Sequence, residues 1–278
     1  MRLKANCKIN IGLDIIRRRE DGFHDLVTVM YPVRGLYDVV TLELAVEPQQ
    51  ISFRSEGLVI DCPEDKNLCI RAAQLMQQRY GEKMQQGLSI TLDKRVPFGA
   101  GLGGGSADAT AVIVGINDLY NLQLSETELI DLAAELGSDT PFFVRNTPQL
   151  CTSRGEVMQD FPLSLDGLYI VLIKPEGVNI STREAFAGIK PATPETPLAE
   201  RLSKPIEQWQ TVIKNDFEPH IFEAHPTLAA IKEQLKKAGA TYTAMSGSGS
   251  TLFALFKFNP TNKLGEQLES YSPYIFEL

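Results

Sequence analysis

The sequence predicts an α+β fold of two lobes, in which strands and helices mix along the chain without regular β-α-β alternation. Its 278 residues are enough for two domains, and 43% of them are apolar, which allows a sizeable core. The second half of the chain starts near Pro148. We therefore expect an N-terminal lobe over residues 1–148 and a C-terminal lobe over residues 149–278.

Strands are expected to open the N-terminal half. Residues 2–16 alternate enough to form a strand, and its Lys8 and Asn10 share one face because strand side chains repeat every two residues. A turn follows at residues 20–22. Further strands are predicted over 26–33, 37–46, 50–55 and 88–93.

Three helices are expected in the same half. The first runs over residues 67–80 and stops at Gly81. The second starts at 104–106 and reaches 119. The third runs over 125–136, opened by the capping box of Ser125 and Glu128.

The C-terminal half mixes both element types. Residues 168–174 and 251–258 read as strands, residues 182–186 as a short helix, and residues 226–238 as an amphipathic helix with proline in its first turn. Three prolines in seven residues mark a surface loop at 191–197.

The most informative segment is the glycine-rich loop over residues 97–107. Residues 99–105 contain five glycines in seven positions, so the backbone can turn sharply and approach a ligand closely. A helix of small residues begins at once. Because loop N–H groups and a helix N-terminus together form an anion site, we expect this loop to hold a phosphate.

Three familiar motifs do not explain this loop. Residues 99–104 fit G-x-G-x-x-G, but a second helix follows where the dinucleotide-binding unit needs a strand. No Gly-Lys-Ser/Thr follows the glycines, and no G-x-S-x-G elbow surrounds Ser106. A purely structural turn is the simpler alternative, and five glycines leading into Ser106 disfavour it.

Composition limits the partners. The net charge of −8 argues against nonspecific binding to nucleic acid or to an anionic membrane. No run of 18 apolar residues and no signal-peptide core is present, so we expect neither a membrane span nor export. The four cysteines lack C-x-x-C spacing, which favours reduced thiols in a cytoplasmic protein and makes a zinc site improbable.

Other positions carry two interpretations each. Asp139 is either a turn or N-cap residue or a base for a hydroxyl nucleophile. Lys8 either faces water from an edge strand or lies beside a carboxylate or phosphate. Lys94 and Arg95 supply positive charge or form a solvated face. The small-residue loop at 244–251 favours a second anion site. Together these features indicate a phosphotransferase.

These residues resemble the GHMP kinase superfamily, which includes galactokinase and the homoserine and mevalonate kinases. Its three motifs match Lys8–Asn10, Pro97–Ala109 and Ser246–Ser250 in order, and the resemblance covers nearly the whole chain. Further stretches resemble those members whose acceptor is a cytidine diphosphate-linked methylerythritol. These stretches are Arg19–His24, Leu136–Phe143 and Asn215–Pro219.

The resemblance implies ATP-dependent phosphorylation of a tertiary hydroxyl, with Mg²⁺ bridging the phosphates and the active site in the cleft between two lobes. Asp139 is then the general base, and Lys8 holds it ionised and polarises the acceptor hydroxyl. The Mg²⁺ ligands stay open. The positions that match ATP-binding residues are Asn67, Leu68, Lys94, Pro97, Gly99, Ala100, Gly101, Leu102, Gly103, Gly104, Gly105, Ser106 and Ala107.

The resemblance also implies a substrate pocket. His24 matches a residue that hydrogen-bonds the cytosine edge, and Phe23 and Phe186 match aromatic residues that sandwich the base. Base–aromatic stacking is worth about 1–3 kcal/mol per base in single-strand binders. The remaining matches lie near the acceptor, beside the pocket or along the diphosphate: Asn10, Thr182, Gly247 and Ser248.

Three positions depart from the common pattern. Many relatives have tyrosine at Phe23, so a phenol hydrogen bond is lost while stacking is kept. Many have Pro-Ala where this chain has Asn6 and Cys7. Many have asparagine at Asp108, which here either helps to hold Mg²⁺ or faces solvent. The alternatives are a homoserine-type or mevalonate-type kinase, or a nucleotide-binding module without activity.

Overall fold

Two long strands at the N-terminus organise the chain, which the computed structural model describes over residues 1–278. Strand β1 (Arg2–Arg18) pairs with strand β2 (His24–Ala45), and both supply residues to two compact units. Unit 1 comprises Met1–Cys7, Leu36–Phe98 and Gly103–Thr147, and unit 2 comprises Lys8–Gly35, Gly99–Leu102 and Pro148–Leu278. The predicted domain boundary at 148/149 stays a prediction.

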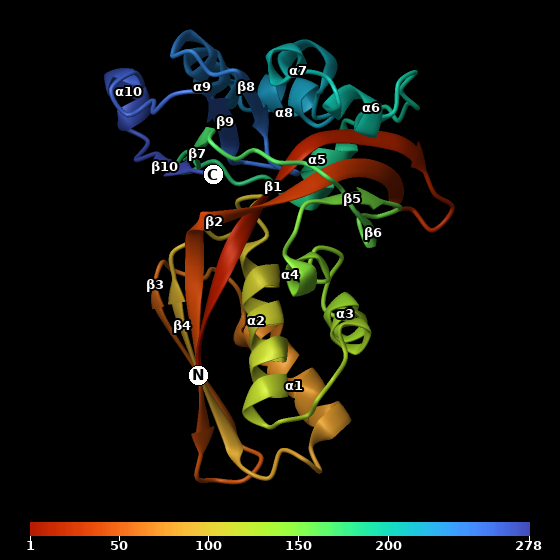
Figure 1. The fold of residues 1–278 in the computed structure, drawn as a ribbon, viewed down its shortest axis with the longest axis vertical. Coiled ribbons are helices and arrows are strands. Elements are labelled where there is room, and N and C mark those ends of the chain that lie inside the picture. The colour runs from red at the N-terminus through yellow and green to blue at the C-terminus, as the bar shows by residue number, and fades with distance from the viewer. The chain divides into compact units, whose positions relative to one another are not determined.

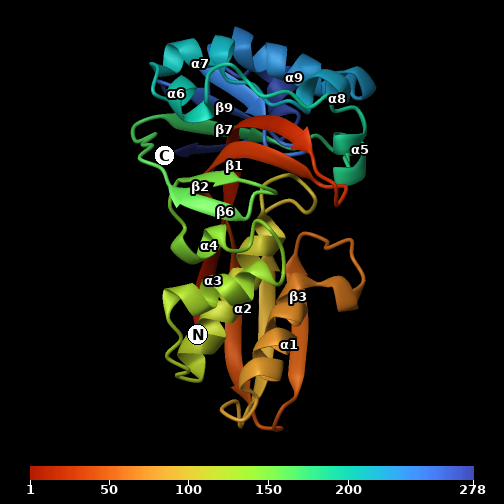
Figure 2. The same cartoon turned by 90° about the vertical axis from the view of Figure 1, so that its right-hand side faces the viewer.

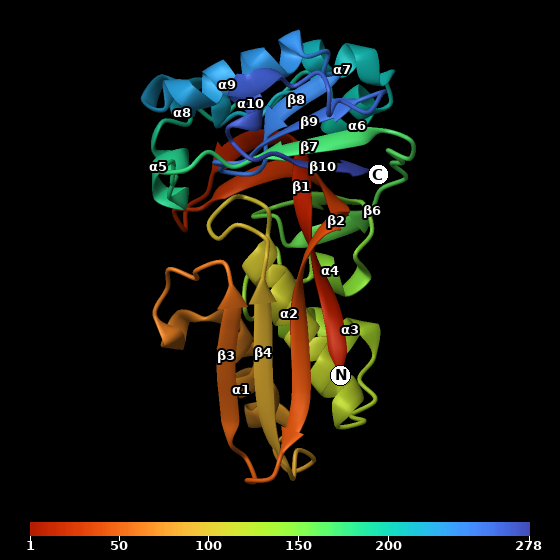
Figure 3. The same ribbon diagram turned by 90° about the vertical axis from the view of Figure 1, so that its left-hand side faces the viewer.

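Unit 1 packs helices on one face of a sheet (Figure 3). Strand β4 pairs in parallel with β3 and antiparallel with the second part of β2. The elements that belong only to this unit are β3 (Ile51–Gly57), η1 (Glu64–Lys66), α1 (Leu68–Tyr80), β4 (Gly87–Lys94), α2 (Gly104–Leu119), α3 (Glu126–Ala134) and α4 (Phe142–Arg145).

A glycine brings α2 close to this sheet. A Cβ atom at Gly115 would lie 2.4 Å from a methyl carbon of Leu42 and 2.8 Å from one of Leu3. Leu42 on β2 is fully buried, as are Ile90 on β4 and Val112 on α2. The core of unit 1 thus lies between the sheet and its helices, and it holds α2 close against the sheet.

Unit 2 contains a four-stranded antiparallel sheet in the order β10-β7-β9-β8. Helices α6, α7, α8 and α9 lie on one face of it (Figures 1 and 2). The first part of β2 pairs with β5, which pairs with β6. Strand bounds are β5 (Gln149–Thr152), β6 (Val157–Asp160), β7 (Tyr169–Ile173), β8 (Tyr242–Met245), β9 (Leu252–Phe256) and β10 (Tyr274–Glu277).

The core of unit 2 joins β1 to this sheet and its helices. Leu13 and Ile15 of β1 pack in one buried cluster with Phe217, Ile231 and Phe256. The helix bounds are α5 (Thr182–Ala187), α6 (Leu198–Leu202), α7 (Ile206–Val212), α8 (Glu218–Ala224), α9 (Pro226–Lys237) and α10 (Gly265–Glu269). No helix is both long and apolar enough to cross a bilayer.

The structure confirms the α+β class and most predicted elements, and it corrects one. The predicted strands 26–33 and 37–46 are one continuous strand, β2. The expected break at 34–36 was wrong because Gly35 keeps an extended backbone in the strand. It packs so closely that an added Cβ would lie 2.4 Å from the Phe276 ring.

A capping substitution tests how α3 begins. The Ser125 hydroxyl accepts a hydrogen bond from the Glu128 backbone N–H, and the Glu128 carboxylate accepts one from the Ser125 N–H. We expect Ser125→Ala to lower the free energy of unfolding by about 1 kcal/mol, measured by urea titration. Thr127→Ala, an exposed position in the same turn, serves as the control. Equal losses in both variants would contradict the capping role.

Candidate active site

Strand β1 buries two polar side chains in unit 2. Lys8 is 3% exposed and Asn10 is 4% exposed, on the face that the strand period predicts for both. The Lys8 Nζ atom donates to Asn10 Oδ1 over 2.5 Å and to the Gly101 carbonyl over 3.2 Å. Asn10 Nδ2 donates to Thr28 Oγ1, and the Thr28 hydroxyl donates to the Gly12 carbonyl. The interpretation of Lys8 as an edge-strand lysine that faces water is therefore excluded.

Two glycine loops close over this pair. The Ser246 hydroxyl accepts from the Asn10 backbone N–H and donates to the Gly101 carbonyl over 2.9 Å. A Cβ at Gly101 would lie 2.2 Å from the Ser246 carbonyl oxygen, and one at Gly247 would lie 3.1 Å from Asn10 Oδ1. Both glycines have positive φ. Segments 99–102 and 246–250 therefore pack in contact only because glycine occupies these positions.

Asn215 fixes the second loop from behind. Its Nδ2 atom donates to the carbonyls of Met245 and Gly247, each over 2.8 Å. Ser248 is half-buried at the tip of the loop. The structure thus assembles four of the predicted residues of this unit in one network: Lys8, Asn10, Gly101 and Gly247.

An aromatic pair forms a second feature of unit 2. The rings of His24 and Phe186 stack with centroids 4.8 Å apart, and Phe217 contacts Phe186 edge-on at 4.9 Å. Phe186 lies on α5, whose first residue is Thr182. Phe23 is 56% exposed next to His24. The ring stacked on Phe186 is therefore that of His24. The sandwich of a bound cytosine between Phe23 and Phe186 stays a prediction.

The protonation of His24 suits a hydrogen bond to a neutral base. Partial burial, helped by the nearby Arg18 cation, lowers the pKa of His24 below its ordinary value. A lowered histidine pKa favours the neutral imidazole, which has one donor and one acceptor nitrogen. The neutral form therefore persists to lower pH than in an unperturbed histidine.

Unit 1 holds a cavity of about 300 Å³ between α1, α2 and β4. Asn67 caps α1, and its Oδ1 atom accepts from the Cys69 N–H over 2.9 Å. The predicted nucleotide residues among its lining are Asn67, Leu68, Lys94 and Gly105. Apolar side chains such as Leu92 and Phe98 complete it, so the cavity suits a flat, partly apolar group.

A buried charge cluster lies beside this cavity. The Lys94 ammonium is 2% exposed and contacts Asp38 Oδ2 over 2.5 Å and Asp108 Oδ2 over 2.8 Å. Asp38 also accepts from the backbone N–H groups of Arg95 and Val96. The cluster joins β2, β4 and α2. Lys94 is therefore buried and does not form a solvated face, whereas Arg95 is exposed and pairs with Asp93.

The protonation of the cluster follows from its burial. Desolvation raises the pKa of Asp108 well above its ordinary value, which favours the neutral acid. Although burial opposes its charge, the carboxylates of Asp108 and Asp38 raise the pKa of Lys94. The suggestion that Asp108 faces solvent was wrong because it is 2% exposed and bonded to Lys94.

Helix α2 begins at the end of the glycine-rich loop. Its N-cap, Gly103, has a φ of 69° and no side-chain cap, which leaves the first N–H groups of the helix for a ligand. A Cβ at Gly104 would lie 3.0 Å from Lys94 Nζ. The loop is shared, with Gly99–Leu102 in unit 2 and Gly103 onward in unit 1.

Asp139 lies in unit 1, half-buried after α3. The hydroxyl of Thr110 on α2 lies 2.9 Å from both the Ser106 carbonyl and the Thr140 carbonyl, so α2 anchors the segment next to Asp139. The pairing of Asp139 with Lys8 stays a prediction.

Sequence reasoning missed Asp38, although a lone carboxylate within the apolar run 36–42 signals a buried, paired charge.

Comparisons with known proteins agree with this geometry. Residues 67–146 match the GHMP kinases N terminal domain, and residues 198–272 match the GHMP kinases C terminal. A 4-diphosphocytidyl-2-C-methyl-D-erythritol kinase of Parabacteroides distasonis is 41% identical over 92% of both chains. A crystal structure of 4-(cytidine 5'-diphospho)-2C-methyl-D-erythritol kinase superposes with a TM-score of 0.82 at 29% identity, covering 99% of this chain and 98% of that one.

The fold extends to a kinase with another acceptor. A homoserine kinase from Cytophaga hutchinsonii superposes with a TM-score of 0.63 at 19% identity, covering 99% of this chain and 94% of that one. At that identity the likeness concerns the fold alone.

The buried cluster predicts a large loss when its cation is removed. Lys94→Met leaves Asp38 without its partner in the core, and we expect the free energy of unfolding to fall by about 3–5 kcal/mol. Asp108→Asn keeps a neutral hydrogen-bonding side chain and serves as the control, with a change near 1 kcal/mol or less. Urea unfolding measures both. Similar losses of stability in both variants would contradict the view that Lys94 is the member of the cluster whose charge the core requires.

The same cluster predicts a pH dependence. Because the folded-state pKa of Asp108 is raised, its stabilising contribution is complete below the unfolded value of 3.8 and declines as pH rises toward the folded value. Asp108→Asn removes this decline. We therefore expect the stability of the variant relative to the wild type to increase between pH 4 and pH 8, measured by thermal unfolding. A constant difference across this range would refute the assignment.

Proposed function

Because the chain belongs to the GHMP kinase family and to its 4-diphosphocytidyl-2-C-methyl-D-erythritol kinases, we propose that it phosphorylates the 2-hydroxyl of 4-diphosphocytidyl-2-C-methyl-D-erythritol. As a kinase of this family it uses ATP as the donor. The observation that carries the proposal is the similarity over nearly the whole chain. The product would enter isoprenoid precursor synthesis by the non-mevalonate route.

The aromatic pair of unit 2 supports this acceptor over homoserine or mevalonate. Neither of those compounds has an aromatic base, whereas cytosine offers a flat ring and a polar edge. His24 and Phe186 supply a stacking face and a neutral imidazole at one place. Thr182 would lie beside this pocket, and Gly247 and Ser248 would line the diphosphate, as the resemblance implies.

The nucleotide would bind through unit 1. Its base fits the cavity beside Asn67 and Leu68, and its phosphates fit the open N–H groups at the start of α2. Lys94 would act mainly by fixing this helix, because both of its carboxylate partners are already in place. The glycines supply close backbone approach without side-chain obstruction.

Phosphoryl transfer would then need positioning and one proton acceptor. The acceptor oxygen attacks the γ-phosphorus, the bond to the β-phosphate oxygen breaks, and ADP leaves. Asp139 would take the hydroxyl proton, and Lys8 with Asn10 would hold the acceptor oxygen. Lys8 suits this role because two acceptors, Asn10 Oδ1 and the Gly101 carbonyl, already hold its ammonium group.

Mg²⁺ is proposed on the chemistry of the available oxygens. This ion keeps several waters and usually binds one or two protein oxygens besides the phosphates. Ser106 in the first turn of α2 is an oxygen donor of that kind, whereas Asp108 is bonded to Lys94 and does not fit. When bound, the ion would neutralise charge on the phosphates.

The cytoplasm is the compartment we propose. All four cysteines are free thiols, and three of them are buried, which suits a reducing environment.

A coupled assay of ADP release tests the proposed reaction. The wild type should turn over 4-diphosphocytidyl-2-C-methyl-D-erythritol with ATP and Mg²⁺, and it should prefer this acceptor to homoserine and mevalonate in parallel reactions. Preferred turnover of either alternative would overturn the proposal. ATP binding without turnover of any acceptor would favour an inactive nucleotide-binding module.

Removing the base should separate binding from chemistry. We expect Asp139→Asn to lower kcat by about 10²–10⁴-fold, because a positioned base contributes that much, while ATP binding by calorimetry stays near the wild-type value. The variant keeps the size of the side chain. Near-normal kcat in a folded variant would rule out Asp139 as the base.

Removing the imidazole should affect one substrate. We expect His24→Ala to raise KM for the cytidine substrate roughly five- to tenfold, because a hydrogen bond and a stacked ring are lost, and to leave KM for ATP within about twofold. Steady-state kinetics with each substrate varied in turn measures both. Equal increases for the two substrates would count against base recognition by His24.

A further inference from the structure

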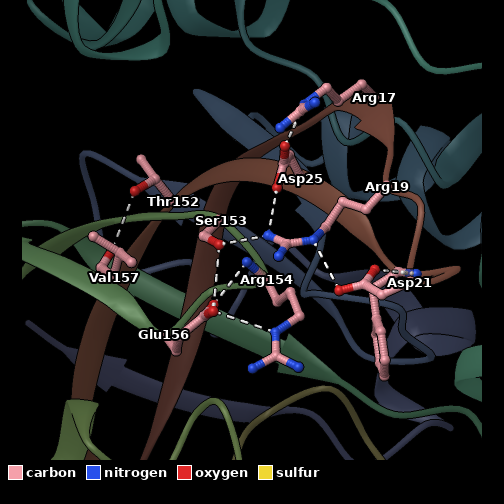
Figure 4. A network of polar contacts seen from close by, with 10 residues as sticks. Arg17, Arg19, Asp21, Asp25, Thr152, Ser153, Arg154, Glu156 and Val157 are labelled. Carbon is pink, nitrogen blue, oxygen red and sulfur yellow. Dashed lines mark hydrogen bonds and ion pairs between the residues drawn. The ribbon is translucent and has the colours of Figure 1, made fainter.

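Arginine and carboxylate side chains brace the hairpin that carries Phe23 and His24 (Figure 4). Asp25 accepts from Arg17 Nε over 2.5 Å and from Arg19 Nη1 over 3.0 Å. These hydrogen bonds outweigh partial desolvation and lower the pKa of Asp25, so it stays ionised. Asp21 accepts from Arg19 Nε and, through Oδ1, from the Phe23 backbone N–H over 3.0 Å. The backbone is therefore held on both sides of Phe23.

The turn between β5 and β6 is tied to this hairpin. The Ser153 carbonyl accepts from the Leu26 N–H over 2.7 Å, and the Ser153 hydroxyl accepts from Arg19 Nη1 over 3.0 Å. The Glu156 carboxylate accepts from the Ser153 hydroxyl, from the Arg154 backbone N–H over 2.7 Å and from Arg154 Nε over 3.2 Å. The network thereby fixes both the turn and the direction of the Arg154 side chain (Figure 4).

Arg154 reaches across to Phe23. Its guanidinium carbon lies 5.2 Å from the centroid of the Phe23 ring, within the range of a cation–π contact. Phe23 is 56% exposed, so few neighbours restrict its ring. The guanidinium is planar and stacks on aromatic faces while its Nε–H bonds a carboxylate, which is the arrangement found here with Glu156.

We propose that Arg154 is a positioning residue for cytosine recognition, which acts by holding the Phe23 ring against the rim of the base site. The proposal rests on the proposed function, because it needs a base to be recognised. Its guanidinium bonds Glu156 and lies beside the Phe23 ring, so its effect should appear in binding of the base alone.

The test is a double-mutant cycle in the kinase assay. Arg154→Ala should raise KM for the cytidine substrate about two- to fivefold, the size expected for loss of an exposed cation–π contact, with kcat and the KM for ATP unchanged. In a Phe23→Ala background the same substitution should have no further effect, because Arg154 acts through the missing ring. Arg154→Lys keeps the charge without the planar guanidinium, and its KM for the cytidine substrate should lie between those of the wild type and Arg154→Ala.

Matched controls separate positioning from stability. Arg79→Ala removes an exposed arginine that bonds Glu135 in unit 1, and it should leave every kinetic constant unchanged. Thermal unfolding should give the same Tm for Arg154→Ala and the wild type. A KM effect that persists undiminished without Phe23, or a fall in kcat instead of a rise in KM, would overturn the proposal.

A binding measurement distinguishes failure of the proposed role of Arg154 from failure of the proposed function. Cytidine diphosphate is titrated into the wild type and Arg154→Ala by calorimetry. Weaker binding by the variant, with the same fold-change as in KM, supports the proposal. Binding by both proteins with equal affinity overturns it while the kinase function stands. No binding by the wild type, together with no turnover, overturns both.

Discussion

Burial of the Lys94 ammonium between Asp38 and Asp108 is the constraint on which unit 1 depends. A lysine in an apolar core is tolerated only when its charge is paired and its protons are accepted: Asp38 pairs the charge, and both side chains accept a hydrogen bond. The three residues come from β4, β2 and α2. Their bonds therefore fix the helix against the sheet near its first turn, which places the uncapped N–H groups beside the adjoining cavity.

Unit 2 also buries polar side chains, and amide, hydroxyl and backbone carbonyl groups form their hydrogen bonds. Lys8 and Asn10 lie on a buried strand. Their polar groups bond each other and atoms of the two loops, which approach this closely because glycine occupies the contact positions. The glycines therefore have two roles. They leave the first N–H groups of α2 without a side-chain cap, and they let two distant loops meet over one strand. Substitution at Gly101 would disturb the position of Lys8 as well as the loop.

Local patterns predicted much of this and missed the contacts between distant segments. Helix caps, strand periods and the glycine loop depend on neighbouring residues, so α1, α2, α3 and β1 were predictable. Partners from distant segments are not encoded in such patterns. Asp38 stood out only as a lone charge in an apolar run, and nothing in the local sequence joins Arg154 to Phe23. The stacking of His24 on Phe186 likewise depends on tertiary packing.

Asp108 and Phe23 share a physical logic. Asp108 lies in a site whose desolvation favours the neutral acid, which resembles an amide in size and in its ability to donate and accept. Phe23 lies beside a cation that Glu156 holds. In both cases a side chain from another segment of the chain, Lys94 or Arg154, orients a residue of the proposed sites. Contacts between distant segments, more than local residue identity, therefore set the geometry around the proposed ligands.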